Sequence, residues 1–306
     1  MRRFLIKVFL VAIISFVVIL ITNVFMLLSK DRLSYYSHER NVALAYERLV
    51  ALKDTNKIVI IAGSSGGFSI NSRPIEQTFH MPVVNTATHG GIGVRMQFEI
   101  YSDLLREGDI VVFCPEYGTG EKRLYGESTL VRILSTHLPQ AYSKLSFAQW
   151  LHISKYIGIH YREARKHRKI EEFDGPYSVK AINGYGDIEW EREHQDTISC
   201  YDIKNLIDEE LVSYYKYVHA TTKKRGIRLL FLPPTLLGSN YHKDAAQIEE
   251  WAGYLKQNGI PLQAEPSKYA FPDSLYFDTP YHMTSVGADV RTKVMIDDML
   301  RLLKDL

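Results

Sequence analysis

The chain has 306 residues, of which 46% are hydrophobic and 24% charged, so it is long and apolar enough to build a full globular core. Its formal net charge of +2 argues against a nucleic-acid binder, which needs a concentrated basic surface. The two cysteines are Cys114 and Cys200. Cys114 ends an apolar run and is expected to be a small buried hydrophobe, and the sequence leaves open whether it pairs with Cys200.

An apolar segment opens the chain. Nearly every side chain from residue 4 to residue 28 is apolar, and about twenty such residues can cross a bilayer as a helix. Arg2 and Arg3 precede the run and favour a cytoplasmic N-terminus. A cleaved signal peptide is the alternative, but the run is long for one and no A-x-A-like site follows it. Residues 1–30 are therefore predicted to be a single-pass anchor that places the rest of the chain outside the cell membrane.

Strand and helix patterns alternate in the remainder of the chain. Residues 31–56 carry an apolar stripe and predict a helical stalk. Strand-like runs follow at 58–62, 82–85, 109–114, 227–232 and, more weakly, 261–264. Helical patterns follow at about 93–106, 203–224, 243–257 and 286–305. This alternation predicts an α/β domain over residues 57–306, a three-layer α/β/α sandwich around a mostly parallel sheet. Such sheets place their sites at the carboxyl ends of the strands.

The stretch from about 118 to 200 interrupts the alternation and is rich in aromatic residues. We expect it to be an insertion over the strand ends, partly helical at about 146–168. It contains a basic run from Arg162 to Lys169. That run is either a solvated helix face or a contact for anionic lipid headgroups or an anionic polymer.

A turn rich in glycine and serine, G-S-S-G-G at 63–67, follows the first predicted strand. Glycines let backbone N–H groups approach a ligand, and a helix beginning near Phe68 would favour developing negative charge. The turn can therefore present a serine hydroxyl at the carboxyl end of the sheet. The alternative is that Ser64 and Ser65 only cap that helix.

The loops after the second and third predicted strands supply further candidates. Backbone N–H groups of Gly90 or Gly91 could join that of Ser65 in an oxyanion hole. A phosphate-cradling loop or a plain connection is the alternative, and the lysine of a Walker A motif is absent. The candidate substrate contacts at the strand ends are Ser64, Asn85, His89, Glu116 and Tyr117.

Asp278 and His282 stand four residues apart in an irregular segment near the C-terminus. A histidine there could face the serine after the first strand, and Asp278 could orient its ring and stabilise the imidazolium. The alternative is an ordinary loop histidine. No second histidine or cysteine lies at ligand spacing, so we predict neither a metal nor a cofactor.

Together these residues resemble the SGNH/GDSL hydrolase superfamily over nearly the whole domain after the anchor. In that family a G-x-S turn after the first strand carries the nucleophile, which maps onto Ser65. A glycine loop after the second strand contributes to the oxyanion hole, which maps onto Gly90 or Gly91. A late segment supplies the other two members of the triad, here Asp278 and His282.

More narrowly, the chain looks like the membrane-anchored, DltD-like branch, whose members act in teichoic-acid D-alanylation and exopolysaccharide acylation. Two features depart from the family pattern. The late segment reads D-x-x-x-H instead of D-x-x-H, which makes Asp273 a second candidate for the orienting acid. Glu116 stands where the family has an asparagine after the third strand, so one oxyanion donor is missing.

The resemblance implies an extracytoplasmic serine acyl-ester enzyme in which His282 deprotonates Ser65. The acyl group would pass to water, as in an esterase, or to a hydroxyl of a cell-surface glycan or teichoic acid, as in a transferase. The membrane bilayer and a membrane-bound O-acyltransferase are the implied partners. The competing hypothesis is a non-catalytic SGNH-like scaffold or glycan-binding partner of such an acyltransferase.

Overall fold

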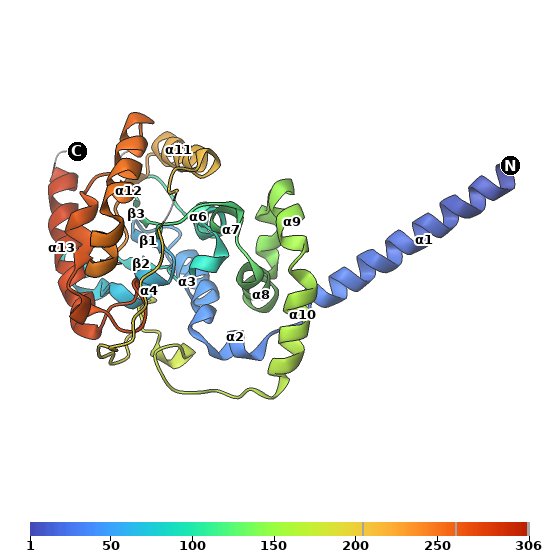
Figure 1. The fold of residues 1–306 in the computed structure, drawn as a ribbon, viewed down its shortest axis with the longest axis horizontal. Coiled ribbons are helices and arrows are strands. Elements are labelled where there is room, and N and C mark those ends of the chain that lie inside the picture. The colour runs from blue at the N-terminus through green and yellow to red at the C-terminus, as the bar shows by residue number, and fades with distance from the viewer. Residues whose placement is uncertain (204, 261, 305–306) are drawn as a thin grey trace.

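A parallel sheet of four strands, in the order β2-β1-β3-β4, forms the centre of the molecule. A computed structural model describes residues 1–203, 205–260 and 262–304 (Figure 1). The strands of this sheet are β1 (Ile58–Ala62), β2 (Val83–Asn85), β3 (Ile110–Cys114) and β4 (Arg228–Phe231). All four lie within runs predicted as strands. The weak run at 261–264 contributes a single parallel bridge between Leu262 and Phe231, and residue 261 lies outside the described residues.

Helices precede, separate and follow the strands. Their bounds are α1 (Arg2–Leu27), α2 (Arg32–Tyr36), α3 (Asn41–Ala51), α4 (Ser64–Ser69), α5 (Ser72–Phe79), α6 (Val94–Ser102), α7 (Glu121–Tyr125), α8 (Ser128–His137), α9 (Phe147–Ser154), α10 (Ile157–Lys166), α11 (Glu209–Lys224), α12 (Gly238–Gln257) and α13 (Ser285–Lys304). The 3-10 helices are η1 (His38–Arg40), η2 (Gly90–Ile92), η3 (Pro139–Lys144), η4 (His167–Lys169), η5 (Val179–Ala181), η6 (Pro266–Tyr269) and η7 (Asp273–Leu275). A small parallel sheet pairs β5 (Leu236–Leu237) with β6 (Ala270–Phe271).

The helical patterns predicted at about 93–106, 203–224, 243–257 and 286–305 correspond to α6, α11, α12 and α13. The helix predicted from residue 203 begins only at Glu209, because the Asp208 carboxylate accepts the N–H groups of Glu210 and Leu211 and so caps the helix there. Residues 204 and 305, at the ends of two predicted helices, lie outside the described residues.

Both faces of the sheet are buried, because alternate residues of each strand enter two different hydrophobic cores. Val59 and Ile61 of β1 belong to a core that also contains residues of α3, α6, α8 and α11. Ile58 and Ile60 belong to the other core, which contains Met295 of α13. This explains why the strands read as continuous apolar runs in the sequence.

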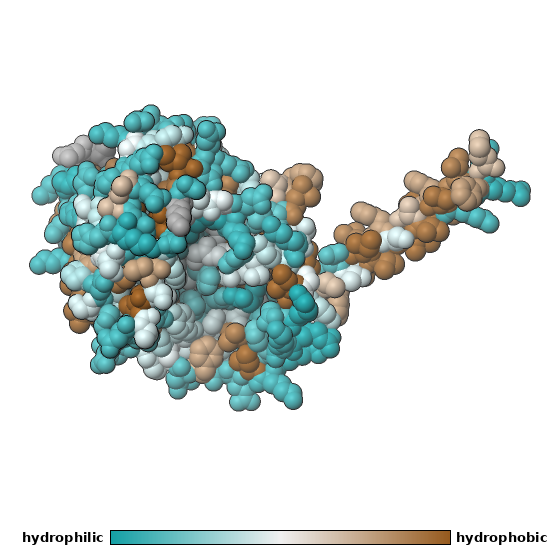
Figure 2. Space-filling model, in the orientation of Figure 1, coloured by the Kyte–Doolittle hydropathy of each residue, from teal (hydrophilic) through white to brown (hydrophobic). Residues whose placement is uncertain are grey.

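The N-terminal helix α1 projects away from the domain (Figure 1). It has 26 residues, none of them buried, and would extend about 39 Å at the usual rise of 1.5 Å per residue. Within the described residues it is the helix long and apolar enough to cross a membrane. Figure 2 shows it coloured as hydrophobic along most of its length, whereas the domain surface is mostly hydrophilic. An exposed helix that is apolar all round is suited to a bilayer and not to water.

The segment predicted as a helical stalk at 31–56 is helical only as far as Ala51, and it does not stand apart from the domain. Val42, Ala45 and Leu49 of α3 are each 0% exposed and pack in the same core as β1. The apolar stripe read from the sequence is therefore the face that α3 buries against the domain. The folded unit begins at the end of the anchor, with Asp31 fully buried.

The aromatic and basic segment from about 118 to 200 forms α7 to α10 and a long irregular stretch. The helical part predicted at about 146–168 is divided between α9 and α10. These two helices lie at the edge of the domain from which α1 projects (Figure 1). The irregular stretch after them brings Tyr177 to the carboxyl ends of the strands.

Two histidines close to the anchor are expected to make the stability of the protein pH-dependent. Burial lowers the pKa of both His38 and His137 from 6.5 to about 4. Both rings therefore stay neutral in the folded state at pH values at which the unfolded chain binds protons. The contribution of these neutral rings to the free energy of unfolding is complete above pH 6.5 and is lost as the pH falls toward 4. The loss is on the order of 3 kcal/mol for a fully buried ring.

The thermal unfolding midpoint of the full-length protein in detergent, measured between pH 7.5 and 5, checks this expectation. His38→Phe is a suitable comparison, because neither ring nitrogen of His38 has a hydrogen-bond partner and the ring packs against Phe68 and Tyr177. The variant should lose less stability than the parent at pH 5. Equal losses in both proteins would contradict a role for His38. The Glu39 carboxyl does not interfere, since its pKa is lowered to about 2 and it titrates below this range.

Candidate functional site

The carboxyl ends of the strands bring together the two sequence segments that carry the serines and the histidine. The first segment begins α4 directly after β1, with Gly63 at the N-cap position. The second is the irregular stretch before α13. Ser69 of α4 joins them, because its hydroxyl donates to the carbonyl of Tyr281 at 2.8 Å and accepts the N–H of Met283 at 3.2 Å.

A serine, a histidine and an aspartate form a hydrogen-bonded chain at this point. His282 Nε2 lies 2.9 Å from Ser64 Oγ, and His282 Nδ1 lies 2.9 Å from Asp278 Oδ1. Tyr177 donates its hydroxyl to the other carboxylate oxygen of Asp278 at 2.5 Å. Hydroxyl, imidazole and carboxylate in this order are the parts of an activated nucleophile.

The D-x-x-x-H spacing is compatible with this contact because the segment closes on itself. The N–H of Phe277 donates to the carbonyl of His282 at 2.8 Å, and Thr279 Oγ1 accepts the N–H of His282 at 3.1 Å. This turn therefore accommodates the one residue by which the spacing between Asp278 and His282 exceeds D-x-x-H. Asp273, the second candidate for the orienting acid, instead accepts the N–H of Ser239 at the start of α12.

The ionisation states of these hydrogen-bonded side chains are consistent with a carboxylate that accepts a hydrogen bond from a histidine ring. Burial raises the pKa of Asp278, but the hydrogen bonds from His282 and Tyr177 outweigh burial, so its pKa lies below the usual value. Burial and the bond to Asp278 raise the pKa of the Tyr177 hydroxyl. Tyr177 therefore remains a donor and Asp278 remains an anion at neutral pH.

The serine that faces His282 is Ser64, so the expectation that the Ser65 hydroxyl would lie there is wrong. Ser65 is 0% exposed, and its Oγ has no hydrogen-bond partner. Because α4 already begins at Ser64, the two side chains point about 100° apart around the helix axis, and only one of them can face the cavity. The carbonyl oxygen of Ser65 accepts a hydrogen bond from the buried guanidinium of Arg291 at 2.8 Å.

Glu116 occupies the space beside the serine turn. Its Oε1 accepts the backbone N–H of Ser65 at 2.9 Å and lies 3.4 Å from Ser64 Oγ. A Cβ atom on Gly63 or Gly90 would approach a carboxylate oxygen of Glu116 to 2.5 Å, so the carboxylate fits only because both residues are glycines. Arg123 lies 3.4 Å from the other carboxylate oxygen.

The carboxylate of Glu116 is held in its charged form. Burial raises its pKa, but the nearby charge of Arg123 and the hydrogen bond from the Ser65 N–H outweigh burial, so the pKa lies below its usual value. An anion thus accepts the hydrogen bond that an oxyanion of a reacting acyl group would need. The sequence left open whether Glu116 holds a substrate or accepts backbone N–H groups, and in the structure it accepts the N–H of Ser65.

The remaining oxyanion candidates, Gly90 and Gly91, differ in their surroundings. The N–H of Gly91 donates to the Nδ1 of His89 at 2.9 Å, within its own loop. Gly90 lies against Glu116 and leaves room for it. Of the predicted donors, Ser65 and Gly91 therefore already have side-chain acceptors in this structure.

Asn85 is not a ligand contact, contrary to the prediction, because it is fully buried. Its side-chain amide donates to the carbonyl of Gly66 at 3.0 Å and to Asp187 at 2.8 Å. Asp187 also accepts the hydroxyl of Ser72 at 2.6 Å. This network fixes the serine turn relative to β2. No local sequence pattern predicted this network.

A cavity of about 780 Å³ opens over Ser64 and His282. Glu116, Tyr117 and His89, all predicted as contacts, line it. Its aromatic lining also includes Phe173, Tyr177, Tyr201 and Tyr281. Other lining residues are Leu33, Ser37, His38, Glu39 and Arg132, and most of these come from the segment that follows the anchor. The volume is in the range of pockets that bind small molecules.

The other predictions concern metals and cysteines. Among the described residues, no group of three or more histidines, cysteines, aspartates or glutamates could hold a metal ion. Cys114 is buried, as predicted, and Cys200 is exposed, and both are free thiols.

The chain matches no protein-family model, no curated protein and no solved structure. Its function is therefore inferred from the geometry and chemistry of its own residues.

Proposed function

We propose that this protein is a membrane-anchored, extracytoplasmic serine acyl-ester enzyme with Ser64 as nucleophile and His282 as base. The observation that carries the proposal is the Ser64–His282–Asp278 chain, in which both links measure 2.9 Å. Its position after the first strand of a parallel sheet is consistent with an SGNH-like α/β/α sandwich. The proposed substrates are acyl esters of a cell-surface polysaccharide or teichoic acid.

The proposed reaction has two steps. His282 Nε2 takes the proton of Ser64 as the Oγ attacks the acyl carbonyl, and the protonated ring then gives that proton to the departing alcohol. The acyl-serine ester is next attacked by water or by a second hydroxyl, whose proton passes to His282. Asp278 stabilises the imidazolium in both steps. Hydrolysis and transfer differ only in the acceptor.

The N–H of Ser65 is the donor that we assign to the acyl oxyanion, and Glu116 binds it at 2.9 Å. For this donor to act, the Glu116 carboxylate moves away and the acyl oxygen takes its place. The nearby Arg123 offers the carboxylate a partner during that movement, since it already contacts Glu116. This makes ester turnover by the resting protein slow.

The lining residues that follow the anchor favour a substrate or acyl donor that arrives from the membrane. Leu33 and Ser37 line the cavity and lie only a few residues after the end of α1. A membrane-bound O-acyltransferase is the partner that this arrangement suits. Transfer would be favoured over hydrolysis where a bound partner excludes water from the cavity.

One observation favours a second candidate, a non-catalytic glycan-binding or scaffold protein. The Ser65 N–H is engaged by a charged carboxylate that a hydrolase of this kind does not need. In this alternative the aromatic cavity would bind a glycan and no acyl-serine would form.

Labelling with a fluorophosphonate distinguishes the two candidates. The full-length protein in detergent is incubated with the probe, and the adduct is located by peptide mass spectrometry. A phosphonylated Ser64 is expected, since the reagent needs an activated serine and little binding energy. Absence of the adduct both in the parent and in Glu116→Asn, whose shorter neutral side chain frees the Ser65 N–H, would favour the scaffold.

Tyr177→Phe should slow labelling by about tenfold without abolishing it. The substitution removes the donor to Asp278 Oδ2 but leaves the contact between Asp278 and His282. Partners that orient a reactive group typically contribute about 10- to 100-fold. The rate should be compared with that of Tyr201→Phe, which also lines the cavity. Equal rates for the two variants would contradict a positioning role for Tyr177.

A further inference from the structure

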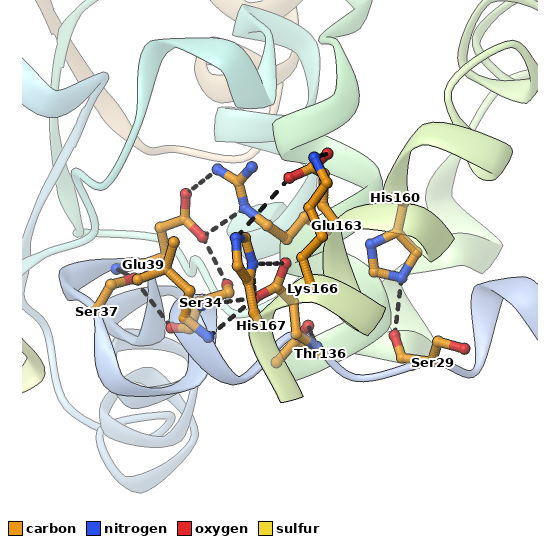
Figure 3. Close-up of polar contacts among 12 residues, drawn as sticks. Ser29, Ser34, Ser37, Glu39, Thr136, His160, Glu163, Lys166 and His167 are labelled. Carbon is orange, nitrogen blue, oxygen red and sulfur yellow. Dashed lines mark hydrogen bonds and ion pairs between the residues drawn. The ribbon is translucent and has the colours of Figure 1, made fainter. Parts of the chain in front are cut away.

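The end of the anchor is attached to α10 by specific contacts. The rings of Phe25 and Tyr161 lie 5.9 Å apart. His160 Nε2 lies 2.8 Å from the carbonyl oxygen of Ser29 (Figure 3). The fully buried carboxylate of Asp31 lies 2.8 Å from His167 Nδ1. The position of α10 relative to the last turn of α1 is therefore defined. If α1 spans the bilayer, α10 lies at the membrane surface.

The exposed side of this region is strongly basic. Residues 147–169 contain six lysines and arginines and a single glutamate. That glutamate, Glu163, is already paired with Lys166 at 2.6 Å. The exposed cations are Lys155, Arg162, Arg165, Lys166, Arg168 and Lys169. Acidic residues resume only at Glu171, beyond the end of η4. Such a cluster next to a membrane span suits anionic lipid headgroups, which attract basic residues near the membrane surface.

The preceding helix, α9, carries apolar side chains on its outer face. Phe147 is 79% exposed and Leu151 is 61% exposed, whereas Gln149 and His152 point inward. Gln149 donates to the carbonyl of Tyr125, and His152 Nε2 lies 2.9 Å from the carbonyl of Gly126. A helix that faces water usually shows the opposite arrangement.

The apolar face of α9 lies on the same side of the molecule as the anchor. Figure 1 places α9 and α10 together at the edge from which α1 projects, and in Figure 2 apolar atoms gather where α9 lies. Phe147 is more exposed than any large apolar side chain of α1, the highest of which is Phe4 at 68%. Exposed apolar and basic side chains on neighbouring helices are typical of segments that lie in a membrane interface.

We propose that α9 and α10 form a second membrane contact. Phe147 and Leu151 enter the interface between headgroups and acyl chains, while the basic residues of α10 and η4 bind anionic headgroups of the same leaflet. This contact fixes the orientation of the domain, and with it the cavity, relative to the bilayer. The proposal rests on α1 spanning the membrane and is independent of any activity at Ser64.

The test uses the full-length protein in vesicles of phosphatidylcholine and phosphatidylglycerol, with Cys200 replaced by serine. A spin label at Leu151→Cys reports whether that position is in water or in lipid. The matched control is Val286→Cys, since Val286 is 63% exposed and belongs to α13, at the opposite edge of the domain (Figure 1). Accessibility to a water-soluble paramagnetic complex should be at least about threefold lower at position 151 than at position 286.

The charge component is tested in the same vesicles. Replacing Arg162, Arg165 and Lys169 by glutamine should raise the water accessibility of position 151, as should vesicles of phosphatidylcholine alone or high salt. These side chains are exposed, and unchanged unfolding midpoints would establish that the variants fold. Equal accessibility at positions 151 and 286 in anionic vesicles would overturn the proposal and indicate that α9 faces water or a protein partner.

Discussion

Ser64→Ala should reduce ester turnover by the full-length protein by about a thousandfold or more. Ser64 Oγ lies 2.9 Å from His282 Nε2, and alanine removes the hydroxyl that would form the acyl intermediate. Losses of this size or larger are typical when the nucleophile of a serine triad is removed, because the remaining groups cannot form the covalent intermediate. The rate of release of p-nitrophenol from its acetate ester, with the fluorophosphonate adduct as a second readout, measures the effect.

Ser65→Ala is the matched control, because it removes the same atom from the neighbouring residue. Ser65 Oγ is buried without a hydrogen-bond partner, whereas the groups of Ser65 that do bind neighbours are its backbone N–H and carbonyl. Alanine keeps both groups, so the rate should change by less than about threefold. A large loss in Ser65→Ala together with an active Ser64→Ala would restore the serine expected from the family resemblance.

The sequence was sufficient to predict the parallel sheet and that His282 would lie near the serine turn. It was not sufficient to predict which of the two adjacent serines faces His282. β1 was predictable because five consecutive apolar residues are all buried in a parallel sheet. The choice between Ser64 and Ser65 depends on where α4 starts. The turn G-S-S-G-G permits either start, since each serine is a good residue for a helix N-terminus.

Two other features depended on tertiary contacts that a local pattern does not contain. The apolar stripe of 31–56 predicted a helix, but the same pattern serves a free stalk and a helix such as α3 that packs on the sheet. Asn85 appeared to be available to a ligand because it ends a strand in the crevice. Its actual partners, Gly66 and Asp187, are 19 and 102 residues away in the sequence.

Glu116→Asn should increase the rate of Ser64 acylation by about tenfold or more. The shorter, neutral side chain no longer reaches the N–H of Ser65, which then becomes available to the acyl oxygen. It also removes a negative charge that lies 3.4 Å from Ser64 Oγ, and therefore close to the acyl oxygen on which negative charge develops during the attack. Removing one oxyanion donor costs serine enzymes about 10²- to 10³-fold, so regaining one is worth an increase of this order.

Glu116→Gln separates the two effects, because glutamine has the same length and no charge. Its amide oxygen can still accept the Ser65 N–H, so we expect a smaller gain than in Glu116→Asn. The double variant Glu116→Asn with Ser64→Ala should be inactive, which would establish that the gain passes through Ser64. Because the pKa of Glu116 lies below its usual value, lowering the pH from 7 to 6 should not reproduce the gain in the parent protein.

The opposite result would assign Glu116 a different role. If both Glu116 variants are slower than the parent while their unfolding midpoints are unchanged, the carboxylate takes part in the reaction itself. The 3.4 Å contact with Ser64 Oγ would then make it a second acceptor for the serine proton beside His282. His282→Ala would in that case retain part of the activity, and the combination with Glu116→Gln would abolish it. If instead Glu116 blocks the donor, His282→Ala alone is sufficient to stop turnover.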